Sequence, residues 1–173
     1  MRGPSSPARR AVLRALGVVP WLCLSSAGAG EDLHAGLKRW GSGDYRRFGV
    51  LVYAATLWAG DDPQRPPRML RLDYKRHIEG RAIVAASVRE MRRFVADEAP
   101  LRRWAEAMQG IFPDVDAGDH IVGLHAGDRV SFHQDGRVLG SIDAPGFAEG
   151  FFAIWLDART SAPALRAALL RLA

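Results

Sequence analysis

Three of the five histidines in this sequence lie close together in the last third of the chain, where they could bind a metal. Turn signals in this region set a register that pairs His125 with Val130 and His133 with Val122. His120 and His133 are then diagonal neighbours on one face of the sheet, and His125 lies on the other face. Two imidazoles without a nearby carboxylate make a poor zinc site. We therefore expect no metal and no other cofactor, and we interpret these histidines as exposed strand residues.

No nucleophile stands in a recognisable catalytic motif. The single cysteine, Cys23, lies in an apolar run near the start of the chain, and no serine has a Gly-x-Ser-x-Gly setting. Gly41-Ser42-Gly43 lacks the strand before it and the helix after it that a phosphate-binding loop needs, so we interpret it as an ordinary loop.

Arg46 and Arg47 stand near the start of Tyr45–Ala59, a segment whose two alternating faces are both apolar. This pattern is typical of a strand that is covered on both sides. Consecutive strand residues point to opposite faces, so one of the two arginines is expected at the mouth of an apolar cavity, where it could hold a carboxylate or a phenolate. Arg47 shares strand parity with Tyr53, which would line the cavity wall, so we prefer Arg47 to Arg46 if the strand has no bulge. The alternative is that both arginines lie in solvent at a frayed strand end.

Residues 1–30 have the composition of an export signal. Four arginines precede a short apolar run, and small residues follow up to Gly30. The apolar run, about ten residues, is too short for a bilayer span of roughly 20. Arg9-Arg10 resembles a twin-arginine signal, and an amphipathic N-terminal helix is the structural alternative. We expect cleavage before Glu31, a mature domain of residues 31–173, a periplasmic or secreted location, and no stable membrane anchor after the signal is removed.

The export signal also carries most of the excess charge. The whole chain has a net charge of +5, but without the four arginines of residues 1–30 its 24 basic residues fall to 20, against 19 acidic ones. A mature charge near +1 gives little reason to expect a nucleic-acid partner, and no basic stripe with interleaved aromatics supports one.

The apolar pattern predicts an α+β domain in which helices cover an antiparallel sheet. Alternating apolar residues and two-residue turn signals predict strands over residues 45–59, 69–78, 119–126, 129–134 and 137–142. Helical spacing of apolar residues, with the usual start and stop signals, predicts helices around residues 84–95, 101–112 and 147–157, and a terminal helix that begins near Pro163.

Several of these segments resemble bacterial chalcone isomerase-like proteins. Val52–Trp58 matches a strand core of the form VY-x-A-x-LW, and Leu72–Tyr74 matches the next strand. Gly118-Asp119 precedes the three-stranded meander as it does in those proteins. The most specific match is the phenylalanine-rich segment Phe147–Thr160, which contains an IWLD end. The resemblance extends over nearly all of the expected mature chain.

The resemblance implies the chalcone isomerase fold, an open β-sandwich with a layer of helices. Plant chalcone isomerases close a chalcone to a flavanone with an arginine that steadies the phenolate and with a threonine and a tyrosine that order water at the ketone. The threonine position falls near Phe48, which cannot donate a hydrogen bond, and the arginine position lies upstream of Arg46. Other proteins of this fold bind fatty acids or haem without this reaction, and a fold alone does not carry a function.

The resemblance therefore implies a non-catalytic protein that binds a hydrophobic carboxylate or a similar small ligand between sheet and helices. An isomerase (an intramolecular lyase) acting on an unsaturated carbonyl compound is one alternative. A structural or interaction module of the cell envelope is the other.

The export signal leads to the first testable prediction. Because the basic start, short apolar run and small-residue end are typical of a cleaved signal, protein purified from its native host should begin near Glu31 and lie outside the cytoplasm. N-terminal sequencing of fractionated cells measures both. Intact Met1 on cytoplasmic protein would contradict the prediction.

Overall fold

The computed structural model describes residues 33–172, so the expected export signal lies outside the described residues. Six antiparallel strands form one open sheet in which each strand pairs with the next along the chain. The strands are β1 (Lys38–Arg47), β2 (Val50–Ala59), β3 (Arg68–Tyr74), β4 (His120–Ala126), β5 (Arg129–Gln134) and β6 (Arg137–Ile142).

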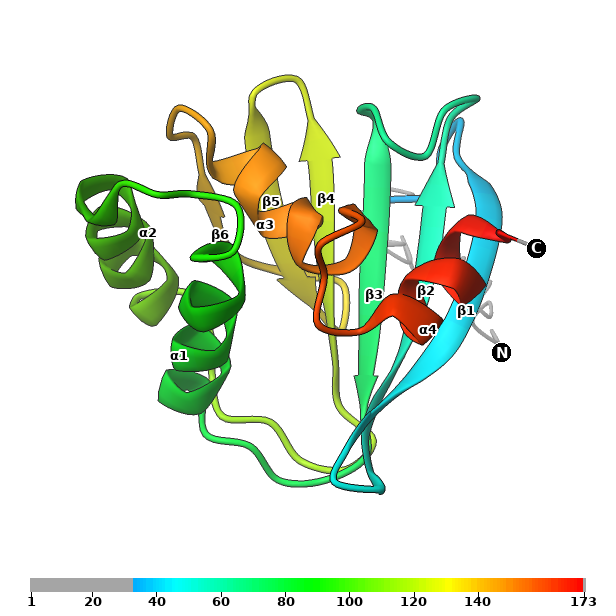
Figure 1. Ribbon diagram of the computed structural model, residues 1–173, viewed down its shortest axis with the longest axis horizontal. Coiled ribbons are helices and arrows are strands. Elements are labelled where there is room, and N and C mark those ends of the chain that lie inside the picture. The colour runs from blue at the N-terminus through cyan, green and yellow to red at the C-terminus, as the bar shows by residue number, and fades with distance from the viewer. Residues whose placement is uncertain (1–32, 173) are drawn as a thin grey trace, which may run out of the picture.

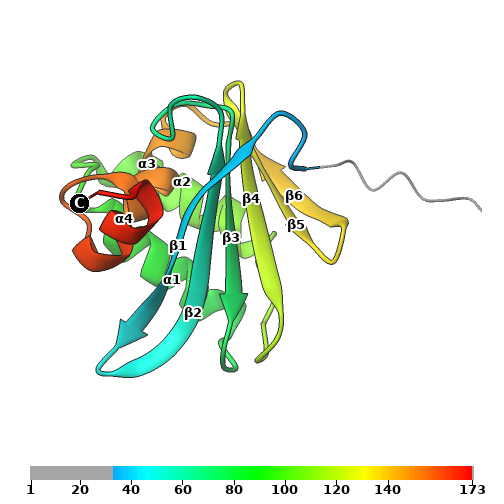
Figure 2. The same cartoon turned by 90° about the vertical axis from the view of Figure 1, so that its right-hand side faces the viewer.

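Four helices lie on one side of this sheet (Figures 1 and 2). They are α1 (Gly80–Met91), α2 (Glu98–Gln109), α3 (Phe147–Leu156) and α4 (Pro163–Leu170). The predicted α+β class, with an antiparallel sheet under a layer of helices, is confirmed. Within residues 33–172 no helix is both long and apolar enough to cross a membrane.

The C-terminal half of the chain folds as its turn signals predict. β4, β5 and β6 match the predicted strands to within one residue, and the predicted pairs His125–Val130 and His133–Val122 are present. Two-residue turns with a positive-φ glycine join these strands, which is why their lengths and register could be taken from local sequence.

The N-terminal half differs from the prediction. The segment predicted as one strand, residues 45–59, is a hairpin in which Phe48 and Gly49 form a two-residue turn between β1 and β2. Gly41-Ser42-Gly43, predicted as a loop, lies inside β1. The prediction was wrong because a phenylalanine in the turn hides the usual signal, and because glycines are rare inside strands.

Glycine at these strand positions lets α4 approach β1 closely. A Cβ atom at Gly41 would lie 2.2 Å from the carbonyl oxygen of Ala168, and one at Gly43 would lie 2.9 Å from the Ala168 Cβ. A larger side chain would push α4 away from the sheet. β3 also ends earlier than predicted, at Tyr74, because the chain turns there toward α1.

The phenylalanine-rich helix α3 forms the centre of the core. Phe151 contacts five aromatic rings, with centroid distances from 5.2 to 6.4 Å. Trp155, one turn further along, is also buried, as its spacing from Phe151 predicted. Trp104 of α2 approaches α3 at Gly150, where a Cβ atom would lie 3.2 Å from its ring. Helix α3 therefore ties the sheet to the other helices.

Truncation of this aromatic centre gives the second prediction. Phe151→Ala should lower the free energy of unfolding by roughly 3–5 kcal/mol, because the change removes a large buried ring and leaves a cavity. The matched control is Phe48→Ala, the same substitution at an exposed residue, which should change stability by less than about 0.5 kcal/mol. Urea titrations measure both variants, and a loss below about 1 kcal/mol in Phe151→Ala would show that α3 is peripheral.

Candidate functional site

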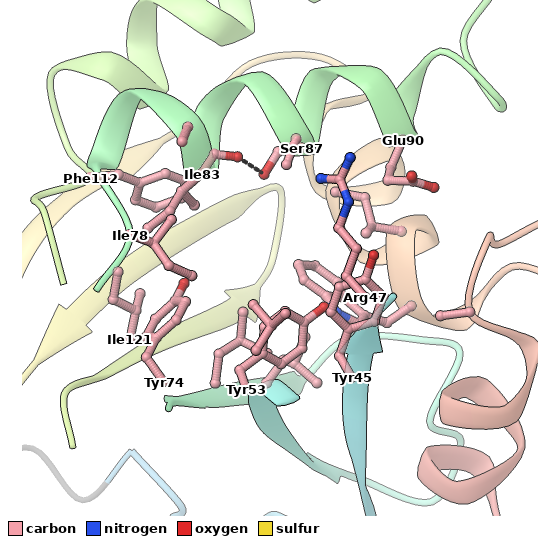
Figure 3. A pocket seen from close by; sticks show the side chains of 18 of the residues that line it. Tyr45, Arg47, Tyr53, Tyr74, Ile78, Ile83, Ser87, Glu90, Phe112 and Ile121 are labelled. Carbon is pink, nitrogen blue, oxygen red and sulfur yellow. Dashed lines mark hydrogen bonds between the residues drawn. The ribbon is translucent and has the colours of Figure 1, made fainter. Parts of the chain in front are cut away.

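A cavity of about 510 Å³ lies between the helix-covered face of the sheet and helices α1 and α3 (Figure 3). Its volume falls within the range of about 300–1,000 Å³ that is usual for small-molecule sites. Residues of five strands line it, and α1 forms the opposite wall (Figure 3).

The deeper part of the cavity is apolar. Leu72 of β3, Ile121 of β4 and Phe132 of β5 point to the same face of the sheet because they are paired or closely spaced on adjacent strands. Phe151 and Ile154 of α3 complete this part. Such a wall offers no partner for a polar group, so it suits an aliphatic or aromatic part of a ligand.

A row of three tyrosines crosses the sheet within the cavity. Tyr45 of β1, Tyr53 of β2 and Tyr74 of β3 are direct register partners, so all three point to the helix-covered face (Figure 3). The rings of Tyr45 and Tyr53 are stacked at 4.9 Å, and those of Tyr53 and Tyr74 meet edge to face at 6.1 Å. The row places three phenolic rings on the floor of the cavity, beside its apolar part.

The hydroxyl of Tyr53 is held by α3. Trp155 Nε1 donates a hydrogen bond of 3.0 Å to this oxygen, so the hydroxyl accepts one bond and keeps its own proton to donate. Burial raises the pKa of Tyr53 well above its ordinary value, and the hydrogen bond from Trp155 only partly opposes this shift. Burial likewise raises the pKa of Tyr74. Both groups are therefore neutral hydrogen-bond donors at physiological pH and unsuited to act as general bases.

Arg46 and Arg47, the two arginines that the sequence suggested as ligand contacts, occupy different positions relative to the cavity. Arg47 lines the cavity, where its side chain extends toward α1 near Ser87 and Glu90 (Figure 3). Arg46 is outside the lining and contacts Asp44 and the Gly49 carbonyl oxygen, each at 3.4 Å.

Strand parity, on which the preference for Arg47 relied, does not explain why Arg47 lines the cavity. Arg47 and Tyr53 are on different strands of a hairpin, and a bulge shifts the register between Tyr45 and Arg46. The bulge and the turn that follows it set the direction of Arg47.

Sequence reasoning missed two further arginines in the lining. Arg76 lies just beyond β3, and Arg89 lies on α1. Within residues 33–172, neither these two nor Arg47 forms an ion pair with a carboxylate, whereas the acidic residue of the lining, Glu90, lies 3.2 Å from Arg93. Arg76 follows a strand end and Arg89 belongs to a basic helix surface, so no local pattern marked either of them. The cavity thus joins an apolar interior to a cationic, hydrogen-bonding rim.

The histidines are not the exposed residues that the sequence suggested. His125 and His133 are only 1% and 5% exposed. His125 Nδ1 accepts a hydrogen bond of 3.2 Å from Arg68 Nε, and the other ring nitrogen lies 3.1 Å from the Gly127 carbonyl oxygen. The prediction failed because Arg68, on the neighbouring strand, gives this imidazole a buried partner. Among residues 33–172, no three histidine, cysteine, aspartate or glutamate side chains are grouped as metal ligands.

Arg68 is itself buried without a carboxylate partner in the described part of the chain. Its guanidinium lies 4.6 Å from the centre of the Phe152 ring and donates to the Gln64 carbonyl oxygen at 2.8 Å. Burial lowers the pKa of Arg68 to about 10, so the group is still charged at neutral pH. A neutral His125 is therefore the form that fits beside it.

Comparison with known proteins finds a distant sequence relative and a solved structure of similar fold. No protein-family profile matches the sequence. An uncharacterized protein of Haemophilus influenzae is 27% identical over 104 residues, which cover 60% of this chain and 52% of that protein. This chain therefore spans about half the length of the curated relative that it matches. Among solved structures, a fatty-acid binding protein of Arabidopsis thaliana is similar, with a TM-score of 0.61 and 14% identity over 78% of this chain and 87% of that one. A likeness at this identity shows a shared fold.

The pair of Arg68 and His125 gives the third prediction. Burial, and then the charge of Arg68, lower the pKa of His125 in the folded protein. The unfolded chain therefore takes up a proton on this residue at a higher pH than the folded protein does, so stability should fall as pH drops below about 6.5. His125→Asn keeps an acceptor for Arg68 but cannot titrate, and it should show a smaller loss between about pH 7.5 and 5.5.

Urea titrations of the two proteins at both pH values measure this difference. His77, whose pKa is raised by its hydrogen bond with Asp116, contributes with the opposite sign but equally in both proteins. An unchanged pH dependence in the variant would show that His125 does not titrate in this range.

Proposed function

We propose that this chain, which has the chalcone isomerase-like fold, binds a hydrophobic carboxylate in the cavity under α1 and catalyses no reaction on it. The fold is the one that the sequence resemblance implied. The proposed ligand is an amphiphile such as a fatty acid, with its tail in the apolar interior and its carboxylate at the rim.

The observation that carries this proposal is the division of the cavity into two chemically different parts. Leu72, Ile121 and Phe132 can surround an alkyl chain, and burial of each methylene would contribute about 0.8 kcal/mol. Arg47 supplies a positive charge at the rim, and Tyr53 supplies a hydroxyl proton within the cavity that is free to be donated. A carboxylate, which only accepts hydrogen bonds, complements both groups.

The comparison supports a ligand of this kind. The similar Arabidopsis structure is described as a fatty-acid binding protein, and a cavity of about 510 Å³ between sheet and helices is available here for such a molecule. An open cavity also favours ligand binding over a purely structural or interaction module, which would have no use for it.

One observation favours the alternative of an isomerase acting on an unsaturated carbonyl compound. Arg47 and the tyrosine hydroxyls line the same cavity, as a site that steadies a phenolate would require. The raised pKa of Tyr53 keeps that hydroxyl protonated, so it cannot act as a base, and Phe48, which stands near the threonine position of the plant enzymes, has no hydroxyl. Conversion of a chalcone to a flavanone by the purified protein would establish this alternative.

The proposal places the protein in the periplasm or outside the cell. Its support is the composition of residues 1–30. A carrier in the envelope would give a poorly soluble carboxylate an aqueous route between membranes.

The fourth prediction tests the rim. Arg47→Ala should weaken fatty-acid binding roughly tenfold, at the lower end of the range for charge-assisted contacts, because this arginine is exposed to solvent. Arg46→Ala is the matched control and should change affinity less than about twofold, because Arg46 contacts Asp44 outside the cavity. Displacement of a fluorescent fatty acid measures both variants.

Three other outcomes would contradict the proposal or part of it. Equal affinity in both variants would remove the role of Arg47. A larger loss in the Arg46 variant would mean that the hairpin has a different register. Absence of binding by the unmodified protein would reject the ligand and leave the interaction module as the better interpretation.

A further inference from the structure

The turn between β1 and β2 exposes an unusually large apolar surface. The side chain of Phe48 is 92% exposed, and that of Val50, two residues later, is 46% exposed. Exposing a whole phenylalanine ring to water is unfavourable, because burial of apolar surface is what stabilises a fold. A ring in this position contributes nothing to the packing of the core.

The backbone of this turn makes the phenylalanine still harder to explain by folding. Phe48 and Gly49 have φ values of 51° and 79°, and the β5–β6 turn has nearly the same geometry, with 51° at Asp135 and 73° at Gly136. Two-residue turns with two positive φ angles prefer asparagine or aspartate before glycine, and bulky residues are strained there. The chain uses the preferred Asp-Gly at one turn and Phe-Gly at the other. A residue that costs stability in this way is expected where function requires it.

Phe48 lies at the mouth of the cavity. Arg47, Phe48 and Val50 all belong to its lining, and the Arg47 guanidinium lies 5.4 Å from the centre of the Phe48 ring. An apolar ring and a cation are therefore presented together on one exposed hairpin.

The charges around this mouth favour an anionic partner. Arg47, Arg76 and Arg89 line the cavity and are exposed, and within the described chain none of them has a carboxylate partner. Two acidic residues of the same elements, Asp44 and Glu90, are already paired with arginines. The free charge at the mouth is positive.

We propose that the β1–β2 hairpin docks the mouth of the cavity onto the surface of an anionic lipid bilayer. In this complex Phe48 and Val50 enter the interfacial region and the arginines contact lipid headgroups. A bilayer fits these features better than a folded protein, because a single protruding ring needs a soft apolar phase and no matching pocket. Docking would let an amphiphile pass between bilayer and cavity without crossing water. This use of the docked state rests on the proposed function, whereas docking itself does not.

Phe48→Asn separates docking from folding, which gives the fifth prediction. Asparagine is preferred at this turn position, so the variant should melt at the same temperature as the unmodified protein or higher. Its binding to phosphatidylglycerol vesicles, measured by co-sedimentation, should fall roughly tenfold because the apolar insertion is lost. Val138→Ser is the matched control: Val138 is 64% exposed but lies on β6, at the opposite edge of the sheet, and this variant should bind vesicles normally.

Changing the lipid headgroup and the salt concentration in the same experiment tests whether the binding is docking onto an anionic bilayer. Docking requires that the unmodified protein binds phosphatidylglycerol vesicles more tightly than phosphatidylcholine vesicles and that added salt weakens the binding. Failure to bind either kind of vesicle, or equal binding by the Phe48→Asn variant, would overturn the proposal. The ligand site is tested separately, because fatty-acid binding by the unmodified protein is measured in vesicle-free buffer. Docking and the proposed function can thus fail independently.

Discussion

The hydrogen bond from Trp155 to the Tyr53 hydroxyl joins two residues that are 102 positions apart in the chain. It lies at the junction of the aromatic helix α3 with the second strand of the sheet, where the Trp155 side chain is buried. An indole N–H buried without an acceptor would cost about 1–3 kcal/mol, so this contact fixes where α3 can rest on the sheet. The same contact uses one acceptor position of the Tyr53 hydroxyl and leaves its proton available to a group in the cavity. Packing and ligand chemistry therefore depend on one bond.

The cavity exists because the helices cover the sheet unevenly. Helix α4 lies tightly on β1, where Gly41 leaves no side chain between them, and the rings of α3 fill the centre. Helix α1 stands over the tyrosine row at a distance that its own side chains, such as Ile83 and Ser87, do not fill. Ser87 donates its hydroxyl proton to the Ile83 carbonyl oxygen of its own helix, so it adds no free donor to the wall. In the proposed complex, contacts to a head group fall to the arginines and the tyrosines.

The sequence allowed accurate prediction where local signals and tertiary structure agree. The strands β4 to β6 and the helices α3 and α4 follow from turn glycines, alternation and helix-start residues, and their bounds were predicted closely. The β1–β2 hairpin was missed because Phe48 stands where a turn usually has asparagine or aspartate. Arg47 and Tyr53 were named from the sequence, but Arg76 and Arg89 were not. Only the folded chain brings these last two to the cavity, from a loop and from a helix surface with no pattern of their own.

The polar groups at the two ends of the helix-covered face differ in whether they have partners within the described part of the protein. At one end Arg68, His125 and the Phe152 ring form a closed polar cluster whose groups satisfy one another. At the other end the Arg47 side chain is exposed, and its charge has no carboxylate partner among the described residues. An amphiphile bound as proposed would have Arg47 at the mouth and apolar side chains such as Leu72 and Ile121 further inside. It is therefore expected to enter tail first and to keep its charged group at the mouth. The register of β3 and β4 places Leu72 opposite Ile121 in the cavity lining, whereas Arg68 and His125, four residues away along each strand, pair with each other outside that lining.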